Sequence, residues 1–484
     1  MPLLLADYKK LREKEKSLIT QKDVHDLLDS QRTFFKTGKT LDISFRIRQL
    51  KRLKACVMRH ESEIEEALYR DLGRHYSEAY FCDIGTVILE INETIKGLSK
   101  WAKPETIFSG LTCFPSVITK VYKMPYGSTL IISPFNFPFT LSLGVLIPAI
   151  AGGNTAVIKA SSKSMHSTAL LGKILEEIFP KKYVAVLDGG HDVADLCLEA
   201  GFDKIFYTGS PKIGKHVMEK AARNLTPVAL ELGGENGNWC IIRKDADLRD
   251  AAKKIAFFKM LNSGQICINI NQVAVASEVA ERFIEILKAE IRRQIGDDAL
   301  LNSEYPCLIN KAAYDKCANE CALYKDRIVY GGRGDNNSLK FEPTIIYPMD
   351  ASDPIVSHEL FNPLLPVVPY KDDEIDALLD TISQREHGLA LYIFTKNINW
   401  AQKVMSSQQF GGGCINEVCL HMMVKGAPFG GTGHSGMGAY HGKWGFMEFT
   451  HPCSVLIGST RFNLPLRQHP YNDIKIRLIK MFER

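Results

Sequence analysis

Residues 204–216 read KIFYTGSPKIGKH, and this stretch decides the fold class. Its first part, Lys204–Tyr207, is a short apolar run typical of a buried strand, and Gly209 marks a turn directly after it. The remaining residues continue as a helix. The first N–H groups of a helix have no partner within the helix, so they can bind a phosphate group. The stretch therefore predicts a strand–turn–helix unit of an α/β protein with a phosphorylated ligand at the start of the helix.

The same stretch resembles the phosphate loop of nucleoside triphosphatases, but two residues argue against that class. Gly209, Gly214 and Lys215 have nearly the required spacing. However, His216 stands where a serine or threonine would bind Mg²⁺, and Pro211 removes an amide group from the loop. The G-x-G-x-x-G pattern of standard dinucleotide-binding folds is also absent from this stretch. Two interpretations stay open for the segment alone: an atypical nucleotide site or an ordinary strand-to-helix turn.

Further apolar runs on both sides alternate with helical patterns. Before the stretch we expect strands at 128–133, 155–158 and 183–187, and a helix at 164–178. After it we expect strands at 239–242, 273–276, 367–370 and 391–394, a strand at Ile345, and helices at 247–261 and 280–295. Apolar strands separated by helices are typical of parallel sheets covered on both faces. We therefore predict two doubly wound α/β lobes with a break near Gly233-Gly234, preceded by helices over the first hundred residues.

Composition excludes several classes of protein. The chain has 484 residues and a net charge of only +5, which gives no indication of nucleic-acid binding. Its twelve cysteines are scattered without a C-x-x-C pair, as in a reduced, cytoplasmic protein, and they form no metal-ligand cluster. Residues 124–158 carry no charge, yet four prolines and four glycines interrupt them. A membrane-spanning helix would break there, so we expect buried strand, loop and helix instead.

Four short segments carry the residues suited to chemistry. Residues 132–138 (ISPFNFP) place Asn136 in a stiff loop at a strand end, and residues 230–234 (LELGG) place Glu231 in an apolar stretch. Residues 262–267 (NSGQIC) end a helix at Gly264 and place Cys267 directly after it. Residues 358–363 read HELFNP. A buried asparagine can simply be satisfied locally, whereas a lone carboxylate in an apolar stretch needs a partner or a function.

In these segments, and in their order, the sequence resembles the aldehyde dehydrogenase superfamily from about residue 30 to about residue 455. It is most similar to the class 3 and fatty-aldehyde group, through residues 214–222 (GKHVMEKAA), 224–228 (NLTPV) and 433–443 (GHSGMGAYHGK). The resemblance implies an atypical Rossmann-like cofactor domain, a catalytic thiol domain and a small β oligomerisation element.

The resemblance also implies the chemistry. Cys267 would attack the aldehyde, and the Asn136 amide with the Cys267 backbone N–H would form the oxyanion hole. Glu231 would activate the water that hydrolyses the resulting thioester, and could first activate the thiol. Cysteine suits this role because nearby amides or helix ends readily lower the pKa of a thiol. No step requires a metal.

The cofactor residues follow from the same resemblance. Lys159 would bind the adenosine ribose, Glu359 the nicotinamide ribose, and Phe361 would pack nearby. The pyrophosphate and the rest of the cleft are assigned to Gly209, Ser210, Gly214 and Ser133. The cofactor would be NAD or NADP, and Ser162 followed by Lys163 favours acceptance of the 2′-phosphate of NADP. The alternative is that Ser162 is neutral and Lys163 points to solvent. Asn362 replaces the family's usual glycine, and its tolerance of positive φ would preserve the turn.

Domains, partners and substrate complete the expectations. The cofactor domain would span 1–111 and 125–232, the catalytic domain 233–415, and an oligomerisation element with the C-terminal tail 112–124 and 416–484. We expect a cytoplasmic homodimer. The tail is too short and charged to span a membrane, although peripheral lipid contact is an alternative. The substrate would be a small-molecule aldehyde, medium-chain aliphatic or aromatic, oxidised to the acid. A coenzyme A-acylating enzyme and a non-catalytic binding protein are the alternatives.

Overall fold

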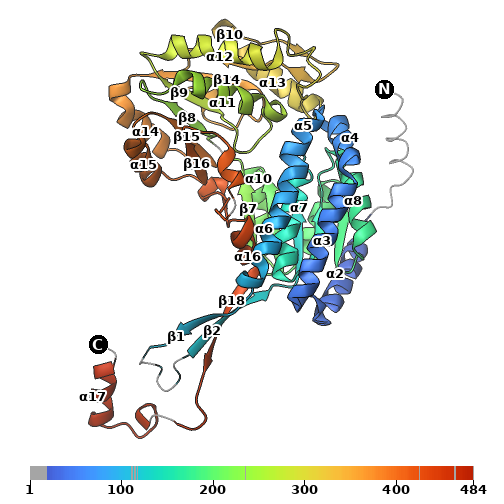
Figure 1. The fold of residues 1–484 in the computed structure, drawn as a ribbon, viewed down its shortest axis with the longest axis vertical. Coiled ribbons are helices and arrows are strands. Elements are labelled where there is room, and N and C mark those ends of the chain that lie inside the picture. Colours follow the sequence, from blue (N-terminus) through green and yellow to red (C-terminus); the bar gives the residue numbers. More distant parts are fainter. Residues whose placement is uncertain are drawn as a thin grey trace.

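The structure, a computed structural model, describes residues 19–110, 113, 116, 118–234, 236–424, 426–462 and 465–482. The chain forms two lobes, each built on a mainly parallel sheet, and an arm that projects from the first lobe (Figure 1). The two doubly wound lobes predicted from the sequence are confirmed.

The sheet of the first lobe has six strands in the order β17-β7-β6-β3-β4-β5. All are parallel except β17, which pairs antiparallel with β7. The strands are β3 (Ser128–Ile132), β4 (Thr155–Lys159), β5 (Val184–Leu187), β6 (Lys204–Gly209), β7 (Val228–Leu232) and β17 (Gly436–Met437). The runs expected at 128–133, 155–158, 183–187 and 204–207 are therefore strands of one sheet.

Helices cover both faces of this sheet. They are α2 (Gln21–Lys36), α3 (Ile43–Arg59), α4 (Glu61–Leu72), α5 (Tyr76–Ala79), α6 (Gly85–Trp101), α7 (Thr140–Gly152), α8 (Met165–Ile178), α9 (His191–Glu199), α10 (Pro211–Ala222) and α16 (Gly442–Glu448). A π-helical turn, Tyr80–Ile84, joins α5 to α6. Leu130 of β3 belongs to the core cluster that contains α2 and α9, whereas its neighbour Ile131 belongs to the cluster that contains α7 and α8. Successive side chains of a strand point to opposite faces, which is why these strands are apolar throughout.

The sheet of the second lobe has seven strands in the order β10-β13-β14-β9-β8-β15-β16, all parallel except β10. The strands are β8 (Trp239–Ile242), β9 (Gln272–Ala276), β10 (Ile328–Tyr330), β13 (Thr344–Ile346), β14 (Leu364–Tyr370), β15 (Ala390–Phe394) and β16 (Gly412–Ile415). A separate pair consists of β11 (Gly334–Asp335) and β12 (Lys340–Phe341). The helices are α11 (Leu248–Met260), α12 (Ala280–Ile295), α13 (Lys311–Leu323), α14 (Ile375–Ser383) and α15 (Ile398–Ser407).

The two lobes share a core. Cys240 and Ile242 of β8 belong to the same buried cluster as Ile131 of the first lobe, together with residues of α11 and α12. Trp239 and Ile241, which alternate with them, pack with α13, α14 and α15 on the other face. The junction between the lobes is therefore packed.

The uncharged stretch 124–158 forms β3, a loop, the fully buried α7 and β4. Pro148 lies inside α7. In the part of the chain that the structure describes, no helix combines the length and the apolar character needed to cross a membrane. The expectation of buried strand, loop and helix is confirmed.

The arm is a three-stranded antiparallel sheet in the order β1-β2-β18, with α17 beyond it (Figure 1). These elements are β1 (Glu105–Phe108), β2 (Ile118–Pro125), β18 (Thr450–Ile457) and α17 (Asp473–Phe482). The expected boundaries differ here in two ways. β1 belongs to the arm although it precedes residue 112, and β17 and α16 join the first lobe although they follow residue 416. Residues 112, 114, 115 and 117 of the expected oligomerisation element, and residues 425, 463, 464, 483 and 484 of the expected C-terminal part, lie outside the described residues.

Candidate active site

Cys267 lies just after a tight turn at the carboxyl end of α11. Three consecutive residues of this turn, Asn262, Ser263 and Gly264, have positive φ angles of 50°, 52° and 78°. Left-handed backbone is unfavourable for residues other than glycine, so the surrounding structure must hold the turn. Glycine is required at 264 for a second reason, because a Cβ atom there would lie 2.2 Å from the carbonyl oxygen of Asn362. The chain leaves the turn with the half-buried Cys267 lining a cavity.

The Asn136 side chain reaches the same turn from the first lobe. It stands in the loop between β3 and α7, is 2 % exposed, and donates from Nδ2 to the carbonyl oxygen of Gln265 at 3.1 Å. Gln265 precedes Cys267 by two residues, so this bond holds the amide beside the cysteine. Asn262 joins the two segments, donating from Nδ2 to the carbonyl oxygens of Asn136 and Gln265 at 3.1 and 3.0 Å. Both residues expected in the oxyanion hole therefore line one cavity.

A buried arginine fixes these two segments to each other. Arg74, between α4 and α5, is fully buried and donates to the backbone carbonyl of Asn136 and, at 3.1 Å, to the side-chain oxygen of Asn262. Asp83 forms an ion pair with it and accepts two backbone N–H groups at the start of α7, at 3.0 and 2.9 Å. A buried ion pair persists only when such additional hydrogen bonds satisfy it. The sequence analysis missed this pair, because an isolated arginine belongs to no motif.

Glu231 faces Cys267 from β7. The residue is 2 % exposed, and neither carboxylate oxygen has a hydrogen-bond partner among the described residues. Burial raises the pKa of Glu231 to about 6, and the neighbouring Cys267 thiol partly opposes that rise. At neutral pH Glu231 is therefore mostly ionised and has a free oxygen to accept a proton.

The environment of Cys267 does not lower the pKa of its thiol, which differs from the expectation. Burial, and then the charge of Glu231, raise the pKa of this thiol well above its ordinary value instead of lowering it. Cys267 follows the carboxyl end of α11, where the helix dipole disfavours an anion. The resting residue is thus a thiol beside a carboxylate, and Glu231 is the nearby group that can take its proton.

Glu359 is a second carboxyl group in the same cavity. It lies over Gly233, where a Cβ atom would be 2.1 Å from its Oε1. This Oε1 has no hydrogen-bond partner among the described residues, and burial followed by the charge of Glu231 raises the pKa of Glu359 to about 8. A half-buried carboxyl group with an unused oxygen is suited to binding hydroxyl groups of a ligand. Phe361 stands nearby, edge to face with Phe135 at a centroid distance of 5.9 Å.

The turn after Glu359 differs from the expectation for Asn362. The positive φ angle, 52°, belongs to Phe361 and not to Asn362. Asn362 uses its side chain instead: Oδ1 accepts from the N–H of Leu364 at 3.0 Å, and Nδ2 donates to Glu320 at 2.8 Å. The turn is therefore held by side-chain hydrogen bonds of asparagine and not by its tolerance of left-handed backbone.

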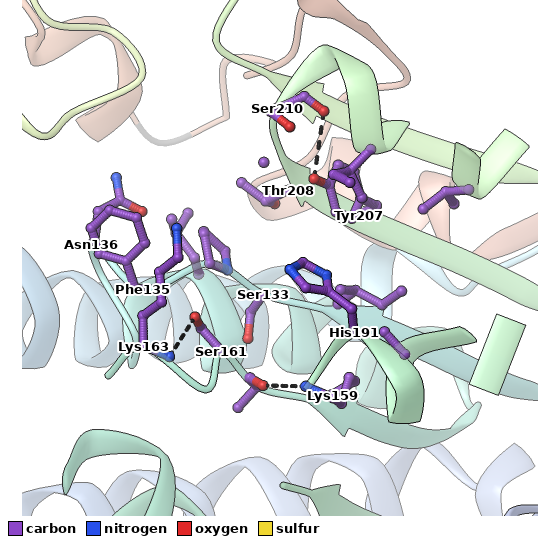
Figure 2. A pocket seen from close by; sticks show the side chains of 18 of the residues that line it. Ser133, Phe135, Asn136, Lys159, Ser161, Lys163, His191, Tyr207, Thr208 and Ser210 are labelled. Carbon is purple, nitrogen blue, oxygen red and sulfur yellow. Dashed lines mark hydrogen bonds between the residues drawn. The ribbon is translucent and has the colours of Figure 1, made fainter. Parts of the chain in front are cut away.

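Most of the expected cofactor residues line one open cavity of about 610 Å³ (Figure 2). Its lining includes Ser133, Asn136, Lys159, Ser162, Gly209, Ser210, Glu231, Cys267, Glu359 and Phe361. Gly214 is not among them. A Cβ atom at that position would lie 2.9 Å from the Leu232 side chain, so the glycine allows α10 to pack closely on β7.

The lysines of this cavity have defined surroundings. Lys159 is buried, and its Nζ donates to the carbonyl oxygens of Ala160 and Gly189, both at 2.8 Å. Lys163 is exposed at the cavity edge, with Nζ 5.1 Å from the centroid of the Phe135 ring. Lys163 is therefore both exposed and part of the cavity lining, and the alternative that it points to solvent stays a prediction.

Several residues of the cavity were missed by the sequence analysis. His191 stands at the start of α9, and His216, on α10, pairs with Asp195 at 2.7 Å. Tyr207 lies under the turn of β6, where a Cβ atom at Gly209 would be 2.3 Å from its hydroxyl oxygen. His191 follows β5 and Tyr207 lies near the end of β6, so the rule that ligands bind at the carboxyl ends of parallel strands could have found these two.

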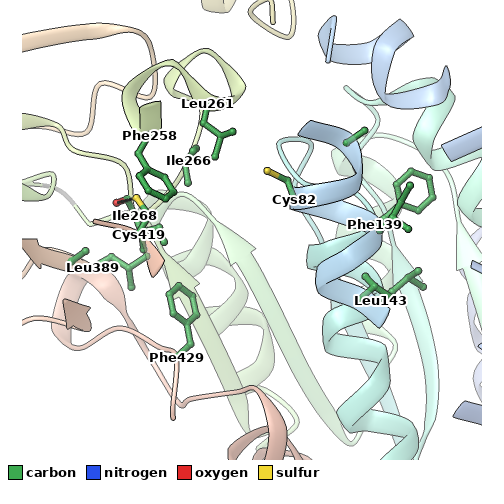
Figure 3. Packing of buried hydrophobic residues seen from close by; sticks show 14 of the residues in the cluster. Cys82, Phe139, Leu143, Phe258, Leu261, Ile266, Ile268, Leu389, Cys419 and Phe429 are labelled. Carbon is green, nitrogen blue, oxygen red and sulfur yellow. Dashed lines mark hydrogen bonds between the residues drawn. The ribbon is translucent and has the colours of Figure 1, made fainter. Parts of the chain in front are cut away.

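A second cavity is also lined by Cys267. It is narrow, about 50 Å³, and its lining is almost entirely apolar, aromatic or sulfur-containing. The lining is Phe81, Cys82, Thr86, Phe137, Thr140, Leu141, Phe258, Leu261, Ile266, Cys267, Ile268, Cys419, Leu420, Met422, Met423, Phe429 and Tyr440. Figure 3 shows Cys82 on a first-lobe helix across from Phe258, Ile266 and Cys419. We call this cavity the apolar tunnel and the larger one the wide cavity.

The chain is similar to known proteins both in sequence and in structure. The model of the "Aldehyde dehydrogenase family" matches residues 13–455. The chain is 37 % identical to 4,4′-diaponeurosporen-aldehyde dehydrogenase of Staphylococcus aureus, over 93 % of this chain and 97 % of that one. It is 34 % identical to the mouse "aldehyde dehydrogenase, dimeric NADP-preferring", over 91 % and 95 %. A substrate-bound structure of Staphylococcus aureus AldH superposes with a TM-score of 0.91 at 36 % identity, covering 95 % and 99 %.

Proposed function

The chain belongs to the aldehyde dehydrogenase family and oxidises aldehydes with a nicotinamide cofactor, and from this premise we propose that Cys267 is its nucleophile, Glu231 its general base and Asn136 a donor of its oxyanion hole. The observation that carries the proposal is the convergence of a thiol, a carboxylate and an amide from both lobes on one cavity. The amide is held two residues from the thiol by the bond to Gln265.

The residues of the wide cavity fit a nicotinamide cofactor. The unpartnered Oε1 of Glu359 is available for ribose hydroxyl groups, Lys159 for the adenosine ribose, and the start of α10 at Ser210 for the pyrophosphate. Gly209 also lines this cavity, and the Tyr207 hydroxyl fills the space where a Cβ atom of residue 209 would stand. When bound, the cofactor supplies the acceptor for the hydride that the substrate carbon loses.

The side chains then have defined tasks. Glu231 takes the proton of Cys267, and the thiolate bonds to the aldehyde carbon, whose oxygen becomes an anion that accepts hydrogen bonds from Asn136. Loss of hydride from that carbon leaves a thioester on Cys267. Glu231 must release its first proton to solvent before it takes another from the attacking water. Cleavage of the C–S bond returns that proton to Cys267 and frees the acid. In total, aldehyde, oxidised cofactor and water give acid, reduced cofactor and one proton.

The substrate we propose is an aldehyde with an apolar aliphatic or aromatic body. The support is the apolar tunnel, which ends at Cys267 and presents aromatic rings and sulfur atoms instead of charges. A tunnel of this kind gains free energy from burying methylene groups and would leave a charged substituent without a partner. One relative carries an apolar substrate in its name, 4,4′-diaponeurosporen-aldehyde, which agrees with this choice.

We further propose that the enzyme accepts NADP as well as NAD. Ser162 and Lys163 line the wide cavity, so a hydroxyl group and a cation are available to a 2′-phosphate where a glutamate would repel it. The mouse relative is named as NADP-preferring.

A cytoplasmic homodimer is also proposed. The strands of the arm expose large apolar side chains, with Phe108 70 % and Ile457 50 % exposed, as expected of an unpaired interface. The mouse relative is named as dimeric. All twelve cysteines are free thiols, which agrees with a reducing compartment. Peripheral lipid contact by the tail remains an alternative prediction.

Two variants test the catalytic assignment. Cys267→Ala should lower cofactor reduction below about 10⁻⁴ of the parent rate, as loss of a nucleophile does in other covalent enzymes, while cofactor binding persists. Glu231→Gln should accumulate an acyl adduct on Cys267, visible as a mass increase after a single turnover. Reduction of cofactor by Cys267→Ala would contradict the assignment. Release of product only when coenzyme A is present would instead support the acylating alternative.

A further inference from the structure

Three side chains of different chemistry meet on the first lobe, away from both cavities. Cys56 lies in the last turn of α3 and His60 caps the end of that helix, its backbone N–H bonded to the carbonyl oxygen of Cys56, and Glu177 reaches them from the end of α8. One ligand atom of each lies within 4.8 Å of the other two. Cys56 is 1 % and His60 8 % exposed, whereas Glu177 opens to solvent. None of the three lines the wide cavity or the apolar tunnel.

The imidazole of His60 is oriented by carboxylates on both sides. Its Nδ1 lies 2.7 Å from Glu63 and its Nε2 lies 2.8 Å from Glu177. Each carboxylate can accept a hydrogen bond from the ring nitrogen that faces it, so the ring is held from both sides. The Cys56 thiol donates to the carbonyl oxygen of Ile174 at 3.4 Å.

We propose that Cys56, His60 and Glu177 form a binding site for a divalent cation of the zinc class. Thiolate, imidazole and carboxylate are the ligands that Zn²⁺ takes in proteins, and three of them leave the fourth tetrahedral position to water. Zn²⁺ would displace the thiol proton of Cys56 to solvent and bind the thiolate. The bond from Nδ1 to Glu63 would remain. A carboxylate that holds the second nitrogen of a ligand histidine is the usual support of such a site.

Arg59 is the competitor for this position. Its guanidinium contacts Glu177 and lies 3.7 Å from the sulfur of Cys56, so a cation already stands between two of the ligands. The Arg59 side chain is 54 % exposed and can turn into water when a metal enters.

The site would act on stability and not on catalysis. α3 and α8 pack against each other and carry the ligands, so a bound ion would join two helices of the first lobe. Because no ligand residue lines either cavity, the ion should raise the midpoint of thermal unfolding and leave the kinetics of aldehyde oxidation unchanged.

Titration of the full chain with Co²⁺ tests the proposal, with Cys267→Ala as the parent so that the reactive thiol does not contribute. We expect one equivalent to bind with a near-ultraviolet thiolate-to-cobalt band and visible bands of a tetrahedral ion, and Zn²⁺ to displace it. Cys56→Ala should lose the thiolate band. Cys197→Ala, which removes another buried thiol that belongs to no such group of three possible ligands among the described residues, should keep the band.

Two further variants separate this site from adventitious binding. Glu63→Gln should weaken Co²⁺ binding about 10- to 100-fold, the usual effect of removing the support of a ligand histidine. Arg59→Gln should strengthen it, because the competing cation is gone. Absence of the thiolate band in the parent, or its persistence in Cys56→Ala with the fold intact by circular dichroism, would overturn the proposal. Equal affinity in the parent and in Arg59→Gln would do the same.

Discussion

The wide cavity and the apolar tunnel meet at Cys267 and differ in almost every other property. The first holds about 610 Å³ and is lined by lysines, carboxyl groups and backbone turns, and the second holds about 50 Å³ and is lined by rings, aliphatic groups and sulfur. Only Cys267 and Leu141 line both. The wide cavity is thus built for a charged ligand whose groups need individual partners, whereas the tunnel selects by size and shape. A change confined to one cavity should therefore leave the ligand of the other unaffected.

Replacement of Asn136, whose side chain is held beside Cys267, should have the largest effect on the reaction rate. Asn136→Ala should slow hydride transfer about 10²- to 10³-fold, because the aldehyde oxygen loses a hydrogen-bond donor as it becomes an anion. The dissociation constant of the cofactor should change little, since Asn136 donates to Gln265 and not to a cofactor-binding side chain. Single-turnover absorbance measures the first quantity and cofactor fluorescence the second.

Asn136→Asp is the matched control, because it keeps the size and replaces the donor with an acceptor. It should be at least as slow as Asn136→Ala. A rate close to that of the unsubstituted enzyme in either variant would remove Asn136 from the oxyanion hole.

Glu231 should make the rate of thioester hydrolysis depend on pH, and this effect is smaller than that of replacing Asn136. Burial raises its pKa to about 6, and only the ionised form can take a proton from water. Thioester hydrolysis should therefore be constant above about pH 7 and fall about tenfold per unit below pH 6. Binding of an apolar aldehyde should not follow this titration, because Glu231 lines the wide cavity and not the tunnel. Rates of hydrolysis from pH 5 to 8, measured after the burst of reduced cofactor, check the profile. A profile without a change near pH 6 would contradict it.

The proposed catalytic residues could be picked out from the sequence because each stands in a short motif, and the resemblance to a known family gave each its expected role. Cys267 after NSGQI, Glu231 before Gly-Gly and Asn136 between prolines were all singled out, and the structure brings them together. The strands were predictable for a similar reason, since burial on both faces leaves a continuous apolar run that can be read locally.

What escaped prediction depends on contacts between distant segments. Arg74 and Asp83 join the Asn136 loop to the turn before Cys267, yet neither lies in a recognisable pattern. The antiparallel strand β17 joins β7 across some 200 residues, a pairing that local periodicity does not encode. The tunnel lining comes from at least five separate segments of apolar residues, which look like ordinary core residues in the sequence.

Replacement of Ser162 tests whether a change confined to the wide cavity alters only the choice of cofactor. Ser162→Glu should lower kcat/KM for NADP about tenfold, since a charge repulsion of about 1 to 4 kcal/mol is expected within 4 Å. The value for NAD should change less than about twofold. Ser406→Glu, an exposed serine on α15 in the second lobe, controls for added charge. The preference for aldehyde chain length should be the same in all three proteins. If the unsubstituted enzyme already rejects NADP, the role of Ser162 is refuted.

Replacement of Met422 tests whether a change confined to the apolar tunnel alters only the choice of aldehyde. Of the four predicted effects, this is the smallest. The Met422 side chain lines the tunnel and is half-buried, so Met422→Ala should widen the space for the substrate by a few methylene groups. Each methylene newly buried contributes about 0.8 kcal/mol, or about a fourfold gain in kcat/KM for the longer aldehyde over the shorter one. Met405→Ala is the matched control. Met405 is also half-buried, but it lies on α15 and packs against the core cluster that contains Trp239 and Ile241. A graded series of straight-chain aldehydes measures the shift, and the NADP to NAD ratio should stay constant throughout. A shift in cofactor preference without one in chain length would mean that the tunnel does not hold the substrate, because only the wide cavity would then respond.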